Sequence, residues 1–277
     1  MKVSMADLIT SAEAARMAGV GPTAIKRWAD SGLLRCVKTV GGHRRFDRQD
    51  VERLVRSGAP EPNAGDWTPW IEALTTDSSV HLLQGRLLEE RARLGAWYVV
   101  AASLGDLLVE LGRRWAAGTL SVIEEHIASA GLQRALAAVS ETIPAGPGAP
   151  RCLLASAEGD DHTLGLSLVE LCLAEAGWRA EWAGSRTRST DVLDRLAGGA
   201  IRMVAISASA SSSNARRLGE QARVIGTACR TAGVTLAMGG AGAWPDTPSF
   251  GIRFHGLQSF YQHALELRQR IDGVRLD

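Results

Sequence analysis

The hydrophobic pattern of the chain falls into three regions, and each predicts a different kind of structure. Residues 8–56 show short amphipathic stretches separated by glycine turns. Residues 67–143 carry apolar side chains at helical spacing, and from residue 151 onward short apolar runs alternate with helical segments. Because strands repeat every second residue and helices every third or fourth, we expect a multidomain protein with separate α and α/β parts.

The first region, "LITSAEAARMAGVGPTAIKRWADSGLL", predicts two helices joined by a turn at "GVG", with Ser11 as the cap of the first helix. The following "LRCVKTVGGHRRF" predicts two short strands around Gly41 and Gly42, and "DRQDVERLVRSG" predicts a closing helix. A hairpin after two such helices forms a wing. We therefore expect a winged helix-turn-helix over residues 1–57.

The second region follows a linker at residues 58–66, where proline, glycine and polar residues disfavour a helix. Helical periodicity then continues with breaks near "TTDSS", "RLGA" and "AAGTL", and Asp77 and Ser121 are plausible helix caps. This pattern predicts a four-helix bundle over residues 67–146.

The third region, residues 150–277, predicts a doubly wound, Rossmann-like parallel sheet. We expect strands at "CLLAS", "RAEWAG", "MVAISAS", "VTLAMGG" and "FGIRFHG", and a last helix over 258–271. Ligands of such sheets bind at the carboxyl ends of the strands. The stretch "EGDDHTLG" directly follows the first strand, and this position marks His162 as a candidate site residue.

Composition adds a charge asymmetry. Residues 1–57 hold 11 Lys or Arg against 6 Asp or Glu, although the formal net charge of the whole chain is only +1. A basic module suggests a polyanion partner, with a basic solubilising surface as the alternative. The longest apolar stretch, "AWYVVAASL", is too short for a membrane span, so we expect a soluble, cytoplasmic protein without membrane contact. The four scattered cysteines fit reduced thiols better than disulfides.

The basic module resembles the winged helix-turn-helix of MerR-type and excisionase-like DNA-binding domains, and "GGHRRF" is similar to their wing sequence. The resemblance implies double-stranded operator DNA as a partner and a homo-oligomer, either a dimer or a tetramer. Six side chains are then expected at the DNA: Thr23, Lys26 and Arg27 from the recognition helix, and His43, Arg44 and Arg45 from the wing. The alternative for the recognition-helix cations is a solvated helix face. Trp28 and Phe46 are expected in the core.

A second resemblance lies in the third region. Asp160, His162 and Gly165 form D-x-H-x-x-G, 41 residues separate Gly165 from Ser207 in "SAS", and Gly239-Gly240 follow the fourth strand. The order and spacing resemble the cobalamin-binding signature of methionine synthase, the mutases and corrinoid proteins. The motif alone is only suggestive, and its placement on the predicted sheet strengthens it.

The resemblance implies a role for each of these residues. His162 would be the lower axial ligand of cobalt, and Asp160 would hydrogen-bond the other ring nitrogen and set the tautomer. The remaining residues would surround the displaced nucleotide tail of the cofactor: Gly165, Gly239 and Gly240 by leaving room, and Ser207 and Ser209 through their hydroxyls. A helix-capping histidine and ordinary strand-end serines are the alternatives. The family usually has a larger residue where this chain has Ser209.

The second region carries its own signal. Trp115 is followed after nine residues by Glu125-His126, which resembles the W-x(9)-E-H pattern in the helical cap of the CarH and LitR group of light-sensing repressors. The resemblance places these side chains over the upper face of adenosylcobalamin, where the indole is a flat wall and the carboxylate accepts hydrogen bonds. Taken singly, Trp115 also fits a core residue and Glu125 a solvated helix face.

The order of DNA reader, helical cap and cobalamin domain resembles the CarH type over nearly the whole chain. It implies a non-enzymatic, cobalamin-dependent transcriptional regulator, a repressor and photoreceptor whose adenosylcobalamin is broken by light. A corrinoid methyl-carrier protein and a regulator of another tetrapyrrole, haem or bilin, are the alternatives. Ala116 stands where such sequences have a histidine, so after illumination we expect either solvent or His126 on the upper face of the cobalt.

Overall fold

The computed structural model describes residues 8–18, 25–26, 28–29, 34–39, 43–56, 67–76 and 79–273. The chain divides into two compact units, Met1–Asp66 and Trp67–Asp277. Each unit is described by itself below.

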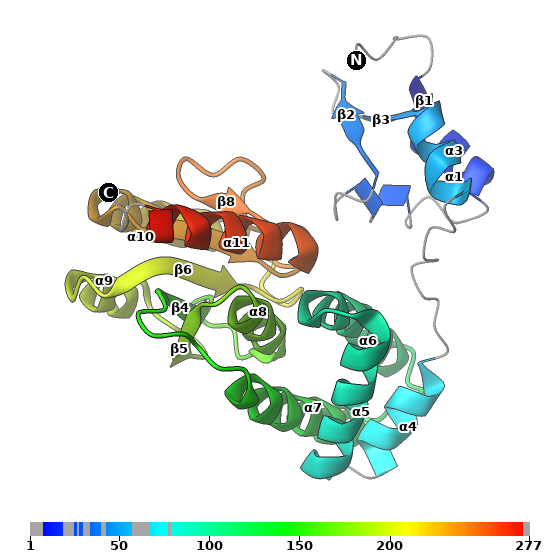
Figure 1. Cartoon of the computed structure of the whole chain (residues 1–277), viewed down its shortest axis with the longest axis horizontal. Coiled ribbons are helices and arrows are strands. Elements are labelled where there is room, and N and C mark those ends of the chain that lie inside the picture. Colours follow the sequence, from blue (N-terminus) through cyan, green and yellow to red (C-terminus); the bar gives the residue numbers. More distant parts are fainter. Residues whose placement is uncertain are drawn as a thin grey trace. The chain divides into compact units, whose positions relative to one another are not determined.

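The first unit contains a three-stranded antiparallel sheet and short helices. Its elements are β1 (Leu8–Thr10), α1 (Ser11–Ala18), β2 (Cys36–Lys38), β3 (Arg44–Asp47) and α3 (Arg48–Arg56) (Figure 1). The sheet order is β1-β3-β2, and β2 pairs with β3 as the predicted hairpin. The hairpin and the closing helix are therefore confirmed. Strand β1 was not predicted, because its three residues are too few to show a period of two.

The cap of α1 lies one residue earlier than the sequence predicts. Thr10, not Ser11, forms the reciprocal pair with Glu13: its Oγ1 accepts from the Glu13 N–H at 3.2 Å, and its own N–H donates to Glu13 Oε2 at 2.8 Å. This exchange satisfies two backbone donors of the first turn. Trp28 and Phe46 are buried in the core of the unit, as predicted.

Some predictions concern residues outside the described part of the chain. These are the turn at "GVG", the wing turn at Gly41-Gly42, the linker 58–66, the Asp77 cap, and the DNA contacts of Thr23 and Arg27. Within the second predicted helix, residues 25–26 and 28–29 are helical.

The second unit begins with the predicted bundle. Its helices are α4 (Thr68–Thr76), α5 (Val80–Leu94), α6 (Trp97–Ala116) and α7 (Val122–Thr142). Ser121 caps α7 in a complete capping box with Glu124, which confirms the predicted cap. The loop between α6 and α7 is short, so the last turn of α6 and the first turn of α7 lie at the same end of the bundle.

The sheet of the second unit is parallel, with strand order β5-β4-β6-β7-β8. Its strands are β4 (Arg151–Ser156), β5 (Arg179–Gly184), β6 (Ile201–Ser207), β7 (Thr235–Gly239) and β8 (Ile252–Arg253). The connecting and closing helices are α8 (Leu164–Glu175), α9 (Ser189–Ala197), α10 (Ala215–Ala232) and α11 (Leu257–Gly273). The predicted α/β fold is confirmed.

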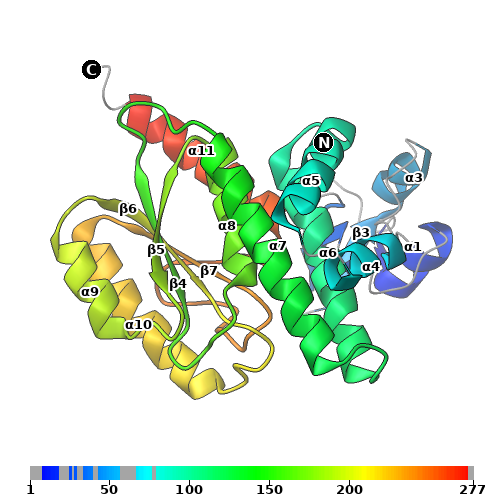
Figure 2. The ribbon, with the colours of Figure 1, turned by 90° about the horizontal axis from the view of Figure 1, so that it is seen from below.

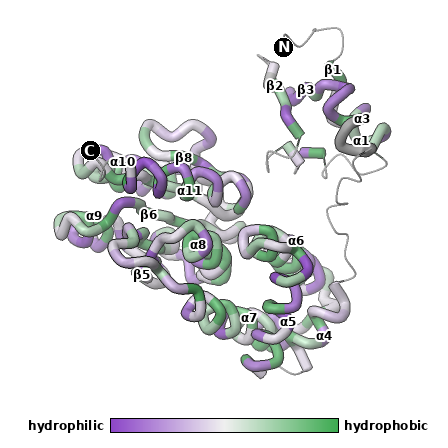
Figure 3. Tube along the Cα trace, viewed as in Figure 1, coloured by the Kyte–Doolittle hydropathy of each residue, from purple (hydrophilic) through white to green (hydrophobic). Residues whose placement is uncertain are grey.

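Alternate residues of the strands pack into two different cores. Leu153 and Ala155 face α9 and α10, whereas Cys152 and Leu154 face α8 and α11. Figure 2 shows α9 and α10 on one side of the sheet, α8 on the other, and the bundle beyond α8. The tube of α8 is largely coloured as hydrophobic in Figure 3, which fits a helix covered by both the sheet and the bundle. One continuous core therefore joins the bundle to the sheet.

Among the described residues, no single helix has the length and apolar character to cross a membrane. The pair α5 and α6 passes that test only when both are taken together across a 118° bend. All cysteines are free.

Candidate functional site

The carboxyl ends of three central strands bring polar and small residues side by side. Ser156 at the end of β4 is the register partner of Ser207 on β6, and Ser207 is the partner of Gly239 on β7. The β4–α8 loop, residues 157–163, leaves the sheet at this edge. Parallel strands present such an edge to a ligand.

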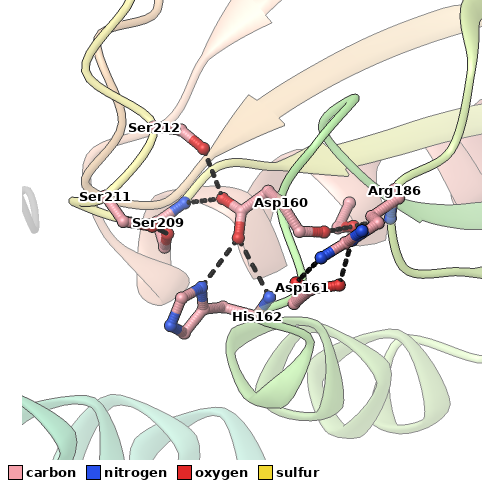
Figure 4. Close-up of polar contacts among 8 residues, drawn as sticks. Asp160, Asp161, His162, Arg186, Ser209, Ser211 and Ser212 are labelled. Atoms are coloured by element: carbon pink, nitrogen blue, oxygen red, sulfur yellow. Dashed lines mark hydrogen bonds and ion pairs between the residues drawn. The ribbon is translucent and has the colours of Figure 1, made fainter.

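Asp160 is the centre of the hydrogen-bond network in this loop. One carboxylate oxygen contacts the Nδ1 of His162 at 2.8 Å and accepts from the His162 N–H at 2.9 Å. The other accepts from the Ser209 N–H at 2.6 Å and from the Ser212 hydroxyl at 2.7 Å. Figure 4 shows the ring on one side of the carboxylate and the serines on the other. The Asp160 side chain is fully buried.

These contacts keep Asp160 ionised. Burial by itself raises the pKa of a carboxyl, but the hydrogen bonds from Ser209, His162 and Ser212 outweigh it and lower the pKa of Asp160 to about 2. A carboxylate is an acceptor only, so the proton of a neutral His162 ring lies on Nδ1. The lone pair of the other nitrogen, Nε2, then points away from the network.

The His162 side chain is 67% exposed, in contrast to its buried partner. The ring is thus held through one nitrogen and open to solvent at the other. This is the arrangement of a histidine that ligates a metal through Nε2 while a carboxylate orients Nδ1–H. Within the described part of the chain, no group of three or more His, Cys, Asp or Glu is placed to hold a metal ion.

Two further contacts hold the loops of the site in place. Gln221 of α10 is buried and bridges two loops: its Oε1 accepts from the Glu158 N–H at 3.1 Å, and its Nε2 donates to the Thr187 carbonyl at 3.1 Å. The Ser156 hydroxyl donates to the Asp160 carbonyl at 2.6 Å and accepts from the Arg186 N–H at 2.9 Å. The β4–α8 loop is therefore held by hydrogen bonds to its neighbours at several points.

The glycines of the predicted signature differ in what they leave open. A Cβ on Gly239 would meet nothing within 4 Å, and one on Gly165 would meet only the Ser207 hydroxyl at 3.8 Å. Gly240 has φ +82°, and a Cβ there would lie 2.2 Å from the Ala208 carbonyl oxygen. Gly239 and Gly165 thus leave room beside the strand ends, whereas Gly240 is required by the packing of the chain itself.

The serines also differ from their expected arrangement. The backbone of Ser209 serves Asp160, and its hydroxyl hydrogen-bonds that of Ser211 at 2.6 Å. Ser207 lies at the strand edge beside Gly165 and Gly239, so its hydroxyl has the better position to meet a ligand in that space.

The bundle presents an open hollow of about 540 Å³ along one face of α7. Its lining is mostly apolar and repeats with helical spacing: Ile123, His126, Ile127, Ala130, Gln133, Arg134 and Ala137. Gln133 also donates from Nε2 to the Thr163 hydroxyl at 2.9 Å, and Thr163 directly follows His162. The face of α7 that lines the hollow therefore contacts the β4–α8 loop.

The three cap residues predicted from the sequence lie at the α6–α7 end of the bundle. Trp115 in the last turn of α6 is 51% exposed, which excludes the core alternative. Glu125 in the first turn of α7 accepts from the Ser129 hydroxyl at 2.6 Å, and its other carboxylate oxygen lies 3.7 Å from His126 Nε2. His126 is exposed and lines the hollow.

In the first unit, the described DNA-contact candidates lie on the hairpin and the adjoining helix. Lys26 and His43 are exposed, and Arg44 and Arg45 are partly exposed. Arg44 Nη1 donates to the Lys26 carbonyl at 2.8 Å, so the wing strand is tied to the second helix.

Several site residues were missed by sequence reasoning. Ser212, Gln133, Thr163 and Gln221 act through contacts with residues 30 or more positions away, for which the local pattern has no signal. A hydroxyl-rich run "SASASSSN" directly after a strand was the one visible hint for Ser212.

Comparison with protein families agrees with this geometry. A model described as "Helix-turn-helix domain" matches residues 8–59, and two described as "B12 binding domain" match residues 76–140 and 150–248. The chain thus has a helix-turn-helix domain followed by B12-binding domains. The order of a DNA-binding domain and cobalamin-binding domains predicted from the sequence is confirmed.

Two curated relatives align with much of this chain. The chain is 27% identical over 258 residues to the HTH-type transcriptional repressor CarA of Myxococcus xanthus, which covers 83% of this chain and 85% of the relative. It is 25% identical over 214 residues to the HTH-type transcriptional repressor CarH of the same organism. That alignment covers 65% of this chain and 71% of the relative.

Among solved structures, the monomethylamine corrinoid protein of Methanosarcina barkeri superposes with a TM-score of 0.54 at 16% sequence identity, covering 72% of this chain and 96% of that protein. At this identity, the likeness is one of fold.

Proposed function

We propose that this protein is a transcriptional regulator whose DNA binding is controlled by adenosylcobalamin, with His162 as the lower ligand of cobalt. The observation that carries the proposal is the exposed His162 ring held by the buried, ionised Asp160 at the carboxyl edge of a parallel sheet. In the same chain, a helix-turn-helix domain precedes this site. The two curated relatives are transcriptional repressors by name, so we place the protein with regulators rather than enzymes.

The residues at the site fit this cofactor. His162 would hold the cobalt of cobalamin through its ring nitrogen Nε2, because Asp160 occupies Nδ1 and the ring is exposed. The open space at Gly239 and Gly165, with the Ser207 hydroxyl beside it, suits the displaced nucleotide tail. Gly240 and Ser209 contribute indirectly, by shaping the loops that border this space.

We assign the bundle to the upper face of the bound cofactor. The exposed Trp115 and the apolar hollow of α7 offer a large organic group a surface to pack on, and Glu125 and His126 offer it polar contacts. The bound cofactor would supply a cobalt–carbon bond that light can break. The protein residues would then act by holding or releasing the bundle over the site.

The first unit is assigned to operator DNA. Lys26 and Arg27 would read the major groove, with Thr23 beside them, and His43, Arg44 and Arg45 would contact the backbone or minor groove. One such unit reads a short site, so the active form is proposed to be a homo-oligomer. Light is the proposed signal, in which case the dark, adenosyl-bound form holds the DNA.

The test is to purify the full chain in the dark, load it with adenosylcobalamin, and record its absorption spectrum and operator affinity before and after illumination. His162→Ala should keep the fold by circular dichroism and lose both the nitrogen-ligated spectrum and most of the bound cobalamin. The matched control is His81→Ala, since His81 is an exposed residue of α5, outside the sheet and its loops. An unchanged spectrum in His162→Ala would rule out the ligand assignment, and haem or bilin absorption in the purified protein would rule out cobalamin.

A further inference from the structure

One hydrogen bond joins the bundle directly to the loop that carries His162. Gln133 in the middle of α7 donates from its Nε2 to the hydroxyl of Thr163 at 2.9 Å. Thr163 follows His162 in the chain and precedes the first residue of α8. The contact therefore connects the helix over the site to the backbone of the proposed ligand.

Thr163 occupies the N-cap position of α8 but does not cap it. A threonine at this position usually accepts a hydrogen bond from a backbone N–H of the first turn. Ser121 and Asn214 do so at α7 and α10, whereas the Thr163 side chain has no such bond. The Thr163 hydroxyl thus serves Gln133 instead of its own helix.

The position of Gln133 determines which face of α7 is directed toward the β4–α8 loop. His126 precedes Gln133 by seven residues, which is two helical turns and about 10 Å along the axis on the same face. Both side chains line the hollow, with Ala130 between them. Holding Gln133 on Thr163 therefore orients the hollow and His126 toward the side of the loop that carries His162.

We propose that Gln133 and Thr163 are positioning residues that hold the bundle in register over the β4–α8 loop. The register itself is a property of the protein without cofactor, and its relevance to cobalamin rests on the proposed function.

The first experiment is hydrogen exchange on the cofactor-free full chain. Thr163→Val removes the acceptor at nearly constant volume, and we expect α7 amides near Gln133 to exchange about fivefold faster, the factor for the ~1 kcal/mol net value of one hydrogen bond. Thr163→Ser keeps the hydroxyl and should restore the slow rate. The matched control is Thr142→Val on α7, because the Thr142 hydroxyl donates to the Val139 carbonyl of the same helix.

Gln133→Met removes the donor of the same hydrogen bond. It should speed exchange of the α7 amides near Gln133 as Thr163→Val does. Equal α7 exchange in Thr163→Val and Thr142→Val would overturn the proposal. Unchanged α7 exchange in Gln133→Met would overturn the proposal as well.

The second experiment adds hydroxocobalamin and follows its release by gel filtration and absorbance. Thr163→Val and Gln133→Met should lose cobalamin about fivefold faster than the native chain and keep its nitrogen-ligated spectrum, because neither change touches the His162–Asp160 pair. Equal release rates would refute the role at the cofactor. If the exchange effects occur and the native chain binds no cobalamin, the proposed function fails and the positioning contact stands.

Discussion

Replacing Asp160 with Asn tests the network that orients His162. The asparagine oxygen can still accept from the His162 N–H and ring. Its amide group then faces the Ser209 N–H, which donates at 2.6 Å in the native chain, so two donors oppose each other in a buried place. The Ser212 hydroxyl can turn and accept, but the Ser209 backbone donor loses its acceptor.

The size of the effect follows from the pKa of Asp160. Burial raises this pKa, but the hydrogen bonds lower it by more, so the pKa falls from the ordinary 3.8 to about 2. A carboxyl whose pKa is lowered by folding stabilises the folded protein above its unfolded pKa and loses that contribution as pH falls toward the folded pKa. The shift corresponds to about 2 kcal/mol at neutral pH. An unsatisfied buried donor costs a similar amount, about 1–3 kcal/mol.

The assay is urea unfolding of the cofactor-free chain, followed by tryptophan fluorescence, at several pH values. Asp160→Asn should be less stable than the native chain by about 2 kcal/mol near pH 6, and the gap should fall to less than half of that near pH 2.5, because the Asp160 carboxyl of the unfolded chain, with its ordinary pKa of 3.8, is protonated there. Asp161→Asn is the control: Asp161 is more than half exposed and pairs with Arg186 at the surface, so its loss should change stability little. A gap that stays constant as the pH falls would refute the reasoning.

Further replacements test separate parts of the molecule. Gly240→Ala should destabilise the apo-protein by about 2 kcal/mol or more in urea unfolding, because the new Cβ would meet backbone at 2.2 Å in a left-handed conformation. Gly239→Ala, where the space is open, should leave apo stability unchanged and weaken cobalamin retention. Glu175→Ala should cost about 2–3 kcal/mol by the same assay, because this α8 carboxylate accepts from two backbone N–H groups at the start of α6, at 2.9 and 2.8 Å; Glu175→Gln should cost less. Arg45→Ala should weaken operator binding for all sequences alike and reduce the slope of log affinity against log salt by about one, which a titration at several salt concentrations measures.

The local sequence was sufficient to predict elements whose signals lie within a few residues. The Ser121 cap and the extents of the strands depend on neighbours in the chain, so they follow from short spacing and backbone periodicity. The His162–Asp160 pair was expected from the resemblance of D-x-H-x-x-G to the cobalamin-binding signature. The same reasoning placed the cap of α1 one residue late, because Thr10 and Ser11 are chemically alike and only the pairing of β1 decides where the strand ends.

Contacts between distant segments were decided only by the tertiary structure. Asp160 meets Ser212 across 52 positions, Gln133 meets Thr163 across 30, and Glu175 meets Tyr98 across 77. In the sequence, Ser212, Gln133 and Glu175 resemble solvated surface residues, because their partners are fixed by how helices pack and strands pair. The two adjacent glycines follow the same rule, because the sequence does not distinguish Gly239 from Gly240. Only the tertiary structure shows that the Ala208 backbone approaches Gly240 closely, so that the fold requires a glycine there, whereas the space beside Gly239 is open.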